Sequence, residues 1–418
     1  MPHLGHLLAI AITIVASTCP GVSRATDAVA DRAGFTLEAA VERALDSNPA
    51  VRGARVAVES AELARRGAGA PRANPTLTVE GGPRFRAGGP EADISVGIQV
   101  PFDLGGTSRR RRASARANLD AARARLAVTE LQVATAVRVS FAEAVAGDGR
   151  VRLAADVVAL NEEMVRVARR RHELGEVSIL EPNFASLELA GAQRALLDAR
   201  VERARAYREL RSLLALSASA SLALSTPLPP EWRGESPSES ALRQRVEDHP
   251  ALVAARDAAR TAVAELEVAR GTGAPGLWAS GSWAREGDED NLVIGGLQIG
   301  LPLQRNQLGV ADATRAAGTA DIDADAAELA VPRDLVVALE VWQTAVARHD
   351  LAASETLPLA EENLELVMKA YEAGREELLA VLLLQRQALA ARRAAIDAEL
   401  ELHRAAAALE RAVGQEVF

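Results

Sequence analysis

The sequence is poor in the residues that build most reactive sites. Its 418 residues include a single cysteine, Cys19, near the N-terminus, so no disulfide and no paired thiolate site can form within the chain. The six histidines are scattered and form neither an HxH nor an HExxH pattern, which argues against the metal and catalytic motifs that use these spacings. We therefore expect no cofactor, no metal site and no enzymatic activity.

Aromatic residues make up only 3% of the chain, although hydrophobic residues make up 49%. The apolar content is mostly alanine, leucine and valine, which favour long, closely packed helices over a thick core built around large rings. Lys369 is the only lysine, and the formal net charge is −9. A net acidic chain is a poor candidate for general nucleic-acid binding, and we expect no nucleic-acid partner.

Long hydrophobic runs are also missing, since the apolar stretch Leu7–Val15 is too short to span a bilayer as a helix. Its length fits the core of a signal peptide. Ser23 and Ala25 place small residues at −3 and −1, so we expect a signal peptide over 1–25 that is cleaved after Ala25. The alternative is a lipid anchor on Cys19, although residues 16–18 match a lipoprotein signal poorly.

The main positive feature is an internal duplication. Asn48-Pro49-Ala50 recurs as His249-Pro250-Ala251 about 200 residues later, and Leu174-Gly175 recurs as Ala373-Gly374. We expect a first repeat over 26–218, a Pro/Ser-rich linker over 219–240 and a second repeat over 241–418. Each repeat is predicted to hold a helix, a β-hairpin and a long helical hairpin; the β-hairpins cover 76–103 and 277–303, and the helical hairpins cover 107–216 and 308–414.

The predicted strands alternate between apolar and polar residues. In the first repeat the apolar face carries Ile94, Val96, Ile98, Val100 and Phe102. In the second it carries Val293, Leu297, Ile299, Leu301 and Leu303. Strands of about ten residues with one apolar face suit a membrane-spanning β-barrel. A pair of half-buried hairpins in a soluble domain would show the same alternation.

The helical segments favour the membrane interpretation. From Thr107 to Arg171 there is no proline, and at ~1.5 Å per residue this helix would be a rod of about 100 Å. We expect Gly147-Asp148-Gly149 to interrupt it and Pro332 to kink its counterpart. The last helix carries a heptad of small and apolar residues, from Val381 to Leu409, which indicates close coiled-coil packing. A soluble coiled coil would account for the helices, but not for an export signal and two embedded β-hairpins.

Four strands cannot close a membrane barrel, because the smallest use about eight. Open strand edges in lipid would leave backbone groups unsatisfied. If the strands span a membrane, several subunits must each contribute four of them.

Five segments together resemble the TolC family of outer-membrane efflux channels, and are most similar to its CzcC/CusC-like heavy-metal branch. They are the helix with its Asn-Pro break at 36–51, the strand end and basic helix start at 99–112, two turn motifs at 170–181 and 369–385, and the segment GLPLQRNQLG at 300–309. Departures from the branch pattern include Gln304 and His172.

This resemblance implies a mainly α-helical fold with a small β part, assembled as a homotrimer. The trimer would combine a twelve-strand outer-membrane barrel with a helical tunnel across the periplasm. The chain would serve as a passive exit duct, joined to a periplasmic adaptor and a proton-driven inner-membrane pump of the RND type. Heavy-metal cations are the expected cargo. Drugs or type I secreted proteins are alternative cargoes, and a periplasmic coiled-coil adaptor is an alternative function.

Two groups of residues are candidates for the functional site. The turns between the long helices would form the periplasmic tip, where the resemblance places adaptor docking and a gate; the candidates there are Arg171, Gly175, Tyr371, Gly374, Arg375, Glu376 and Glu377. The second group is the basic run Arg109, Arg110, Arg111 and Arg112, which would either contact lipid head groups at the rim of the barrel or form a solvated helix start.

Overall fold

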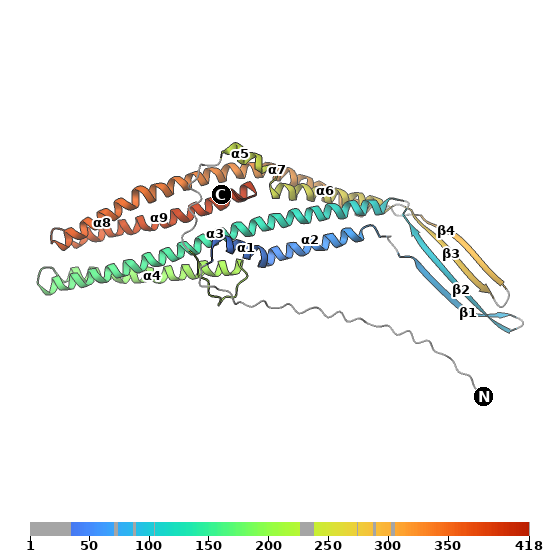
Figure 1. The fold of residues 1–418 in the computed structure, drawn as a ribbon, viewed down its shortest axis with the longest axis horizontal. Helices are drawn as coiled ribbons and strands as arrows, with labels where there is room; N and C mark the ends of the chain where they lie inside the picture. The colour runs from blue at the N-terminus through green and yellow to red at the C-terminus, as the bar shows by residue number, and fades with distance from the viewer. Residues whose placement is uncertain are drawn as a thin grey trace, which may run out of the picture.

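A computed structural model describes residues 35–70, 74–86, 89–103, 105–225, 238–273, 275–286, 290–301 and 306–417. The predicted signal peptide at 1–25, Cys19, most of the predicted linker and Gln304 lie outside the described residues. The described part is elongated, with a sheet at one end and the turns between long helices at the other (Figure 1).

The first half contains α1 (Leu37–Ser47), α2 (Pro49–Gly67), β1 (Thr76–Arg86), β2 (Gly89–Phe102), α3 (Thr107–Glu173) and α4 (Leu180–Leu213). The second half contains α5 (Glu239–Val246), α6 (Pro250–Gly271), β3 (Gly276–Glu286), β4 (Asp290–Gly300), α7 (Gln307–Leu351), a π-helical turn (Ala352–Thr356), α8 (Leu357–Glu372) and α9 (Leu378–Val413).

The recurring X-Pro-Ala motif starts a helix in each half. The Asn48 side chain accepts a hydrogen bond from the Ala50 backbone N–H at 2.9 Å, and the His249 ring nitrogen Nδ1 accepts one from Ala251 at 3.0 Å. A proline follows each cap at the first helical position, where its missing N–H costs nothing. The motif therefore sets the N-terminal ends of α2 and α6.

The four strands form one antiparallel sheet in the order β1-β2-β3-β4. Its register places Val96 opposite both Val79 and Trp283, so most of the large apolar residues of the four strands share one face, while Leu292, Ile294 and Trp278 lie on the other. The two predicted β-hairpins are thus joined through β2 and β3. Neither edge, β1 or β4, pairs with another strand among the described residues.

The long helices pack as two antiparallel hairpins, α3 with α4 and α7/α8 with α9 (Figure 1). The predicted heptad of α9 is buried or half-buried along its length, which confirms the expected coiled-coil face. Within the described part of the chain, none of the helices combines the length and the apolar character that crossing a membrane requires.

The expected interruption of α3 at Gly147-Asp148-Gly149 is wrong, because the helix continues through these residues. The glycines instead allow close packing of two neighbouring helices. A Cβ on Gly147 would lie 3.3 Å from the Cα of Arg203 on α4, and one on Gly149 would lie 3.6 Å from Ile396 on α9. Asp148 adds a 2.6 Å hydrogen bond from the Tyr207 hydroxyl.

The helix also continues through Pro332 without a change of helix type. The irregularity lies further along, at the π-helical turn Ala352–Thr356. Pro358 follows this turn and sits in the first turn of α8. A proline has no N–H to donate and its ring crowds the carbonyl four residues earlier, here that of Ser354, so the backbone widens at this point.

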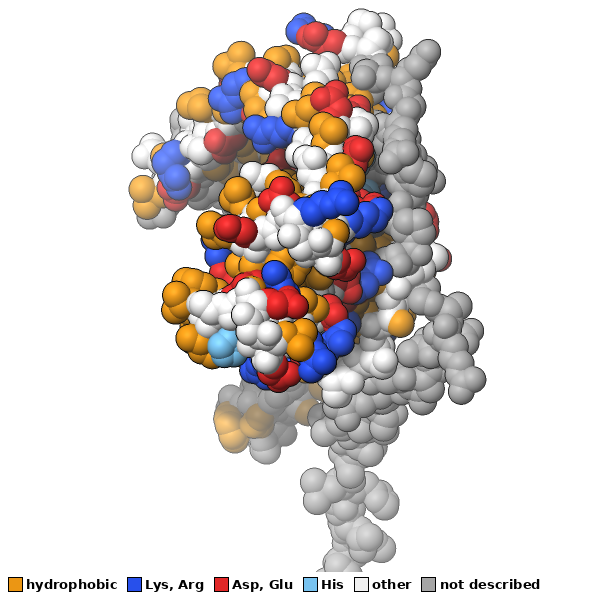
Figure 2. Space-filling model, turned by 90° about the vertical axis from the view of Figure 1, so that its left-hand side faces the viewer, with side chains coloured by type: hydrophobic (Ala, Val, Ile, Leu, Met, Phe, Trp, Pro, Cys, Tyr) orange, Lys and Arg blue, Asp and Glu red, His pale blue; other side chains and the backbone are white. Residues whose placement is uncertain are grey.

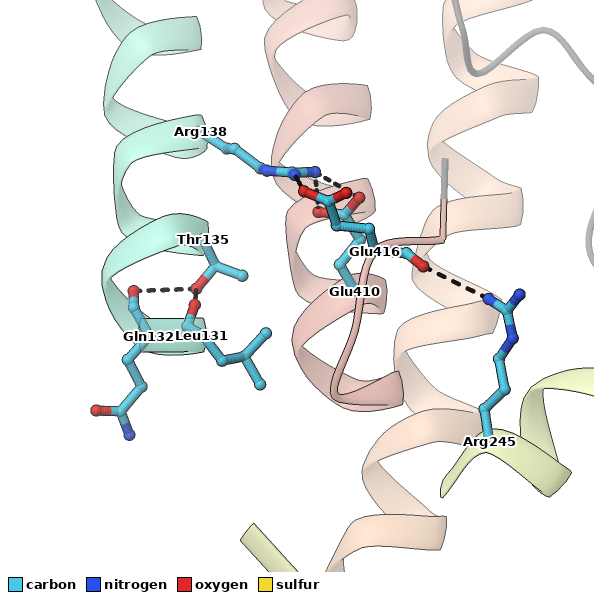
Figure 3. Close-up of polar contacts among 7 residues, drawn as sticks. All are labelled: Leu131, Gln132, Thr135, Arg138, Arg245, Glu410 and Glu416. Atoms are coloured by element: carbon cyan, nitrogen blue, oxygen red, sulfur yellow. Dashed lines mark hydrogen bonds and ion pairs between the residues drawn. The ribbon is translucent and has the colours of Figure 1, made fainter. Parts of the chain in front are cut away.

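Charged pairs join the two helical hairpins along their length. The most buried of them links Arg138 on α3 with Glu410 on α9, at 2.5 Å to each carboxylate oxygen, and Arg138 also pairs with Glu416 (Figure 3). Burial raises the pKa of Glu410, and the Arg138 charge opposes that rise. Further pairs between the hairpins are Glu143–Arg404, Arg150–Asp397 and Glu188–Arg386.

A buried histidine makes the helical part sensitive to acid. Burial, with a smaller contribution from His349, lowers the pKa of His403 to about 4. In the unfolded chain this imidazole takes up a proton near pH 6.5, whereas in the folded chain it does so only near pH 4. The free energy of unfolding therefore has its full value above pH 6.5 and decreases as the pH falls toward 4. The loss amounts to about 3 kcal/mol from this group.

We expect the thermal unfolding temperature to drop between pH 7 and pH 4.5, and to drop less in His403→Leu. Comparing the pH dependence of the two proteins cancels the contribution of titrating groups that do not interact with His403. An equal drop in both proteins would contradict the assignment to His403.

Candidate functional site at the hairpin ends

The two turns between long helices have the same backbone geometry. Gly175 ends α3 with φ +77°, and Gly374 ends α8 with φ +69°, a left-handed conformation that favours glycine. Each turn closes with the two hydrogen bonds of a Schellman motif. They run from Gly175 to His172 and from Glu176 to Arg171 in the first turn, and from Gly374 to Tyr371 and from Arg375 to Ala370 in the second, all within 2.9–3.0 Å.

Next to these turns, Glu181 on α4 links the two hairpins. It accepts a hydrogen bond from the Tyr371 hydroxyl at 2.9 Å and lies 3.4 Å from the Arg171 guanidinium. That guanidinium stands 5.0 Å from the centre of the Tyr371 ring, within the range of a cation–π contact. The structure thus brings together Arg171 and Tyr371, which are far apart in the sequence, around a carboxylate that sequence reasoning did not select.

Tyr371 acts as a hydrogen-bond donor in this cluster. Burial and the neighbouring Glu181 carboxylate raise its pKa, so the hydroxyl stays protonated at neutral pH. Arg171 also contacts Glu176 at 3.3 Å, which gives it two carboxylate partners in its own chain. The cluster therefore holds α3, α4 and α8 together at the turn end.

The other predicted tip residues behave differently. Arg375, Glu376 and Glu377 are exposed, and within the described part of the chain their side chains make no hydrogen bond or ion pair. Apolar side chains are exposed at the same end, among them Phe184 and Leu379. Figure 2 shows this end of the molecule, where hydrophobic side chains and charges of both signs intermingle.

Three of the four arginines in the basic run reach toward the ends of neighbouring helices. Arg111 donates to the Ala70 carbonyl, just beyond α2, at 2.9 Å. Arg112 lies against Gly69, and Arg110 against Gly271 at the end of α6. Positive charge near helix C-termini is stabilising, so these side chains offset the cost of four positive charges at the start of α3. Arg109 is exposed.

Asp103 supplies the cap that α3 needs. Its carboxylate accepts hydrogen bonds from the backbone N–H groups of Thr107 at 3.0 Å and Ser108 at 2.6 Å. The Ser108 N–H is the main cause of the strongly lowered pKa of Asp103. The sequence signal that could have predicted this cap is an aspartate shortly before a Gly-Gly-Thr-Ser helix start.

The sequence matches the family model described as "Outer membrane efflux protein" over residues 40–216 and 241–415. It is 26% identical over 326 residues to the cobalt-zinc-cadmium resistance protein CzcC of Cupriavidus metallidurans, covering 76% of each chain.

The fold is similar to that of solved structures with TM-scores of about three quarters. The outer membrane protein VceC of Vibrio cholerae gives a TM-score of 0.75 at 18% identity, with 91% of this chain and 97% of that chain covered. CusC, described as forming a transmembrane channel, gives 0.76 at 17% identity, with 93% and 96% covered.

Proposed function

Because the chain belongs to the outer membrane efflux protein family, we propose that three copies assemble into one continuous exit duct. The observation that carries this proposal is a sheet with one apolar face and two unpaired edges, set at one end of long charged helices. On the apolar face, Val293 is 78% exposed and Leu297 is 74% exposed in the single chain. Lipid is the environment in which such a face is stable.

The unpaired edges require further copies. A sheet edge in lipid leaves backbone N–H and C=O groups without partners, at several kcal/mol each. Pairing β4 of one subunit with β1 of the next satisfies both edges, and three copies supply the twelve strands of a closed barrel. The polar face of the sheet then lines the lumen.

The other end of the duct would meet its partners. We place docking of a periplasmic membrane-fusion adaptor at the exposed tip residues Gly175, Gly374, Arg375, Glu376 and Glu377, and coupling to a proton-driven RND-type pump behind it. We assign heavy-metal cations as cargo, because CzcC is named a cobalt-zinc-cadmium resistance protein. The duct itself has no catalytic role in this proposal.

The cluster of Arg171, Glu181 and Tyr371 is our candidate for the gate at the tip. We expect opening of the tip to separate the two hairpins there, and Glu181 joins them next to the turns. Glu181→Ala should therefore raise single-channel conductance in planar bilayers, while Arg375→Ala, whose side chain makes no hydrogen bond or ion pair with the described residues, should raise it less. Equal effects of the two variants would remove Glu181 from the gate.

Contact with lipid head groups is proposed for Arg109 alone of the basic run, since the side chains of Arg110, Arg111 and Arg112 lie against the C-terminal ends of α2 and α6. Arg109→Ala should weaken insertion into anionic liposomes, and the loss should shrink at high salt. A loss that is independent of salt would leave only a structural role.

The proposed function can be tested by a pair of neighbouring substitutions on opposite faces of β4. Leu297→Arg puts a charge on the lipid face, at a cost of about 2–4 kcal/mol near the bilayer midplane, and should abolish outer-membrane insertion. Gln298→Arg puts the same charge on the polar face, away from lipid, and should still be inserted. The readouts are membrane fractionation and restored tolerance to cobalt, zinc and cadmium in a strain that lacks this gene.

Equal insertion of the two variants would contradict the barrel. Insertion of the unmodified protein without any recovery of metal tolerance would contradict the cargo and leave the barrel standing.

A further inference from the structure

One aromatic side chain stands apart on the polar face of the sheet. Trp278 on β3 shares this face with small and polar residues such as Ser280, Ser282 and Gln298, and it is the single aromatic there among the described side chains. It lies near the start of β3, at the end of the sheet closest to the helices (Figure 1). In the proposed trimer, three copies of Trp278 would surround the passage from the helical tunnel into the barrel.

Two glycines determine how this indole lies. Gly276 and Gly300 face each other across β3 and β4, on the same side of the sheet as Trp278. A Cβ on Gly276 would come within 2.5 Å of the ring atom Cη2, and one on Gly300 within 2.9 Å of Cζ3. The six-membered ring therefore occupies the space that two side chains would fill, and it is folded down onto the backbone.

This arrangement leaves part of the indole open to the lumen. Trp278 is half-buried. One part of the ring is covered because it lies over the two glycines, and the rest stays open because no other described element packs over the polar face of the sheet. The π face of an indole attracts cations, with quaternary ammonium groups as the well-known ligands of aromatic surfaces. Because the ring lies over the two glycines, it stays close to the wall, and its open part can contact a cation without blocking the pore.

We infer that Trp278 is a specificity-determining residue of the duct, at which cations contact an aromatic ring that lies over Gly276 and Gly300. This inference rests on the proposed channel function, because it needs the polar face of the sheet to line the lumen. It adds a contact for organic and other weakly hydrated cations at the junction between helices and barrel.

The probe is tetraethylammonium, added on the sheet side of single channels in a planar bilayer. We expect it to block the unmodified channel, and Trp278→Ala to weaken the block about twofold to fivefold, the range expected for an exposed cation–π contact. Trp278→Phe should retain most of the block, while Trp278→Leu should weaken it as much as Trp278→Ala does. A block that survives in Trp278→Leu as well as in Trp278→Phe would overturn the cation–π assignment.

Gly300→Ala tests whether this glycine positions the Trp278 indole. Its methyl group should displace the indole and change the block in the unmodified background, but change nothing further in Trp278→Ala. Gly82→Ala is the matched control, because it lies on the same face with no atom within 4 Å of its Cβ, and it should have no effect. An effect of Gly300→Ala that persists in Trp278→Ala would show that Gly300 does not act by positioning the indole. The absence of any channels in the unmodified protein would instead contradict the proposed function.

Discussion

Arg138→Ala is expected to destabilise the helical part by about 3–5 kcal/mol, because it leaves a buried carboxylate without its partner. The Glu410 side chain is only 3% exposed and takes both close contacts from Arg138. Figure 3 shows the arginine reaching from α3 to α9 and to Glu416 in the C-terminal segment, so its loss affects both hairpins. Thermal or denaturant unfolding in detergent, followed by helical circular dichroism, measures the change.

Two variants test whether the loss of stability depends on burial of the ion pair and on the unpaired charge. Arg348 and Glu401 form an ion pair of 3.3 Å that is exposed on both sides, so Arg348→Ala should cost less than about 1 kcal/mol. The double variant Arg138→Met with Glu410→Leu removes both charges and should recover much of the lost stability. A double variant as unstable as Arg138→Ala would show that packing of the long side chains, and not the unpaired charge, is responsible.

The repeated pattern of the chain could be predicted from its sequence because each signal is local. The X-Pro-Ala motifs, the period-two alternation of the strands and the heptad of α9 each depend on neighbouring residues, and each lies where the structure has the corresponding feature. The predicted interruption of α3 at Gly147-Asp148-Gly149 was wrong because a pair of glycines can either break a helix or let another helix approach closely. Only the positions of Arg203 and Ile396, far away in the sequence, decide between these outcomes.

The site was predictable in part for the same reason. Both turns were visible from Leu174-Gly175 and Ala373-Gly374, but the partner of Arg171 and Tyr371 was not. Glu181 is one of many glutamates on the helices, and nothing in its own neighbourhood marks it. Its role follows from the way the two hairpins lie side by side at the turn end, which places the Tyr371 hydroxyl 2.9 Å from its carboxylate.

Gly374→Trp is expected to leave folding and export intact but to abolish efflux. Nothing lies within 4 Å of a Cβ at Gly374 or Gly175, so a new side chain starts into open space in its own subunit. The left-handed backbone costs a non-glycine residue about 1–2 kcal/mol, which a chain of this size tolerates. The indole would instead project from the surface assigned to adaptor docking, and it should exclude the partner.

Matched variants separate that docking effect from strain and from bulk. Gly374→Asn introduces a residue that tolerates the left-handed conformation and adds little volume, so efflux should be retained. Gly53→Trp places the same bulk on α2, away from the tip, at another glycine with no neighbours within 4 Å, and efflux should again survive. Metal tolerance of intact cells is the readout, with membrane fractionation as the check on export. Normal tolerance in both Gly374→Trp and Gly175→Trp would remove docking from the turns, because a side chain of this size cannot be accommodated at a closely packed interface between helices.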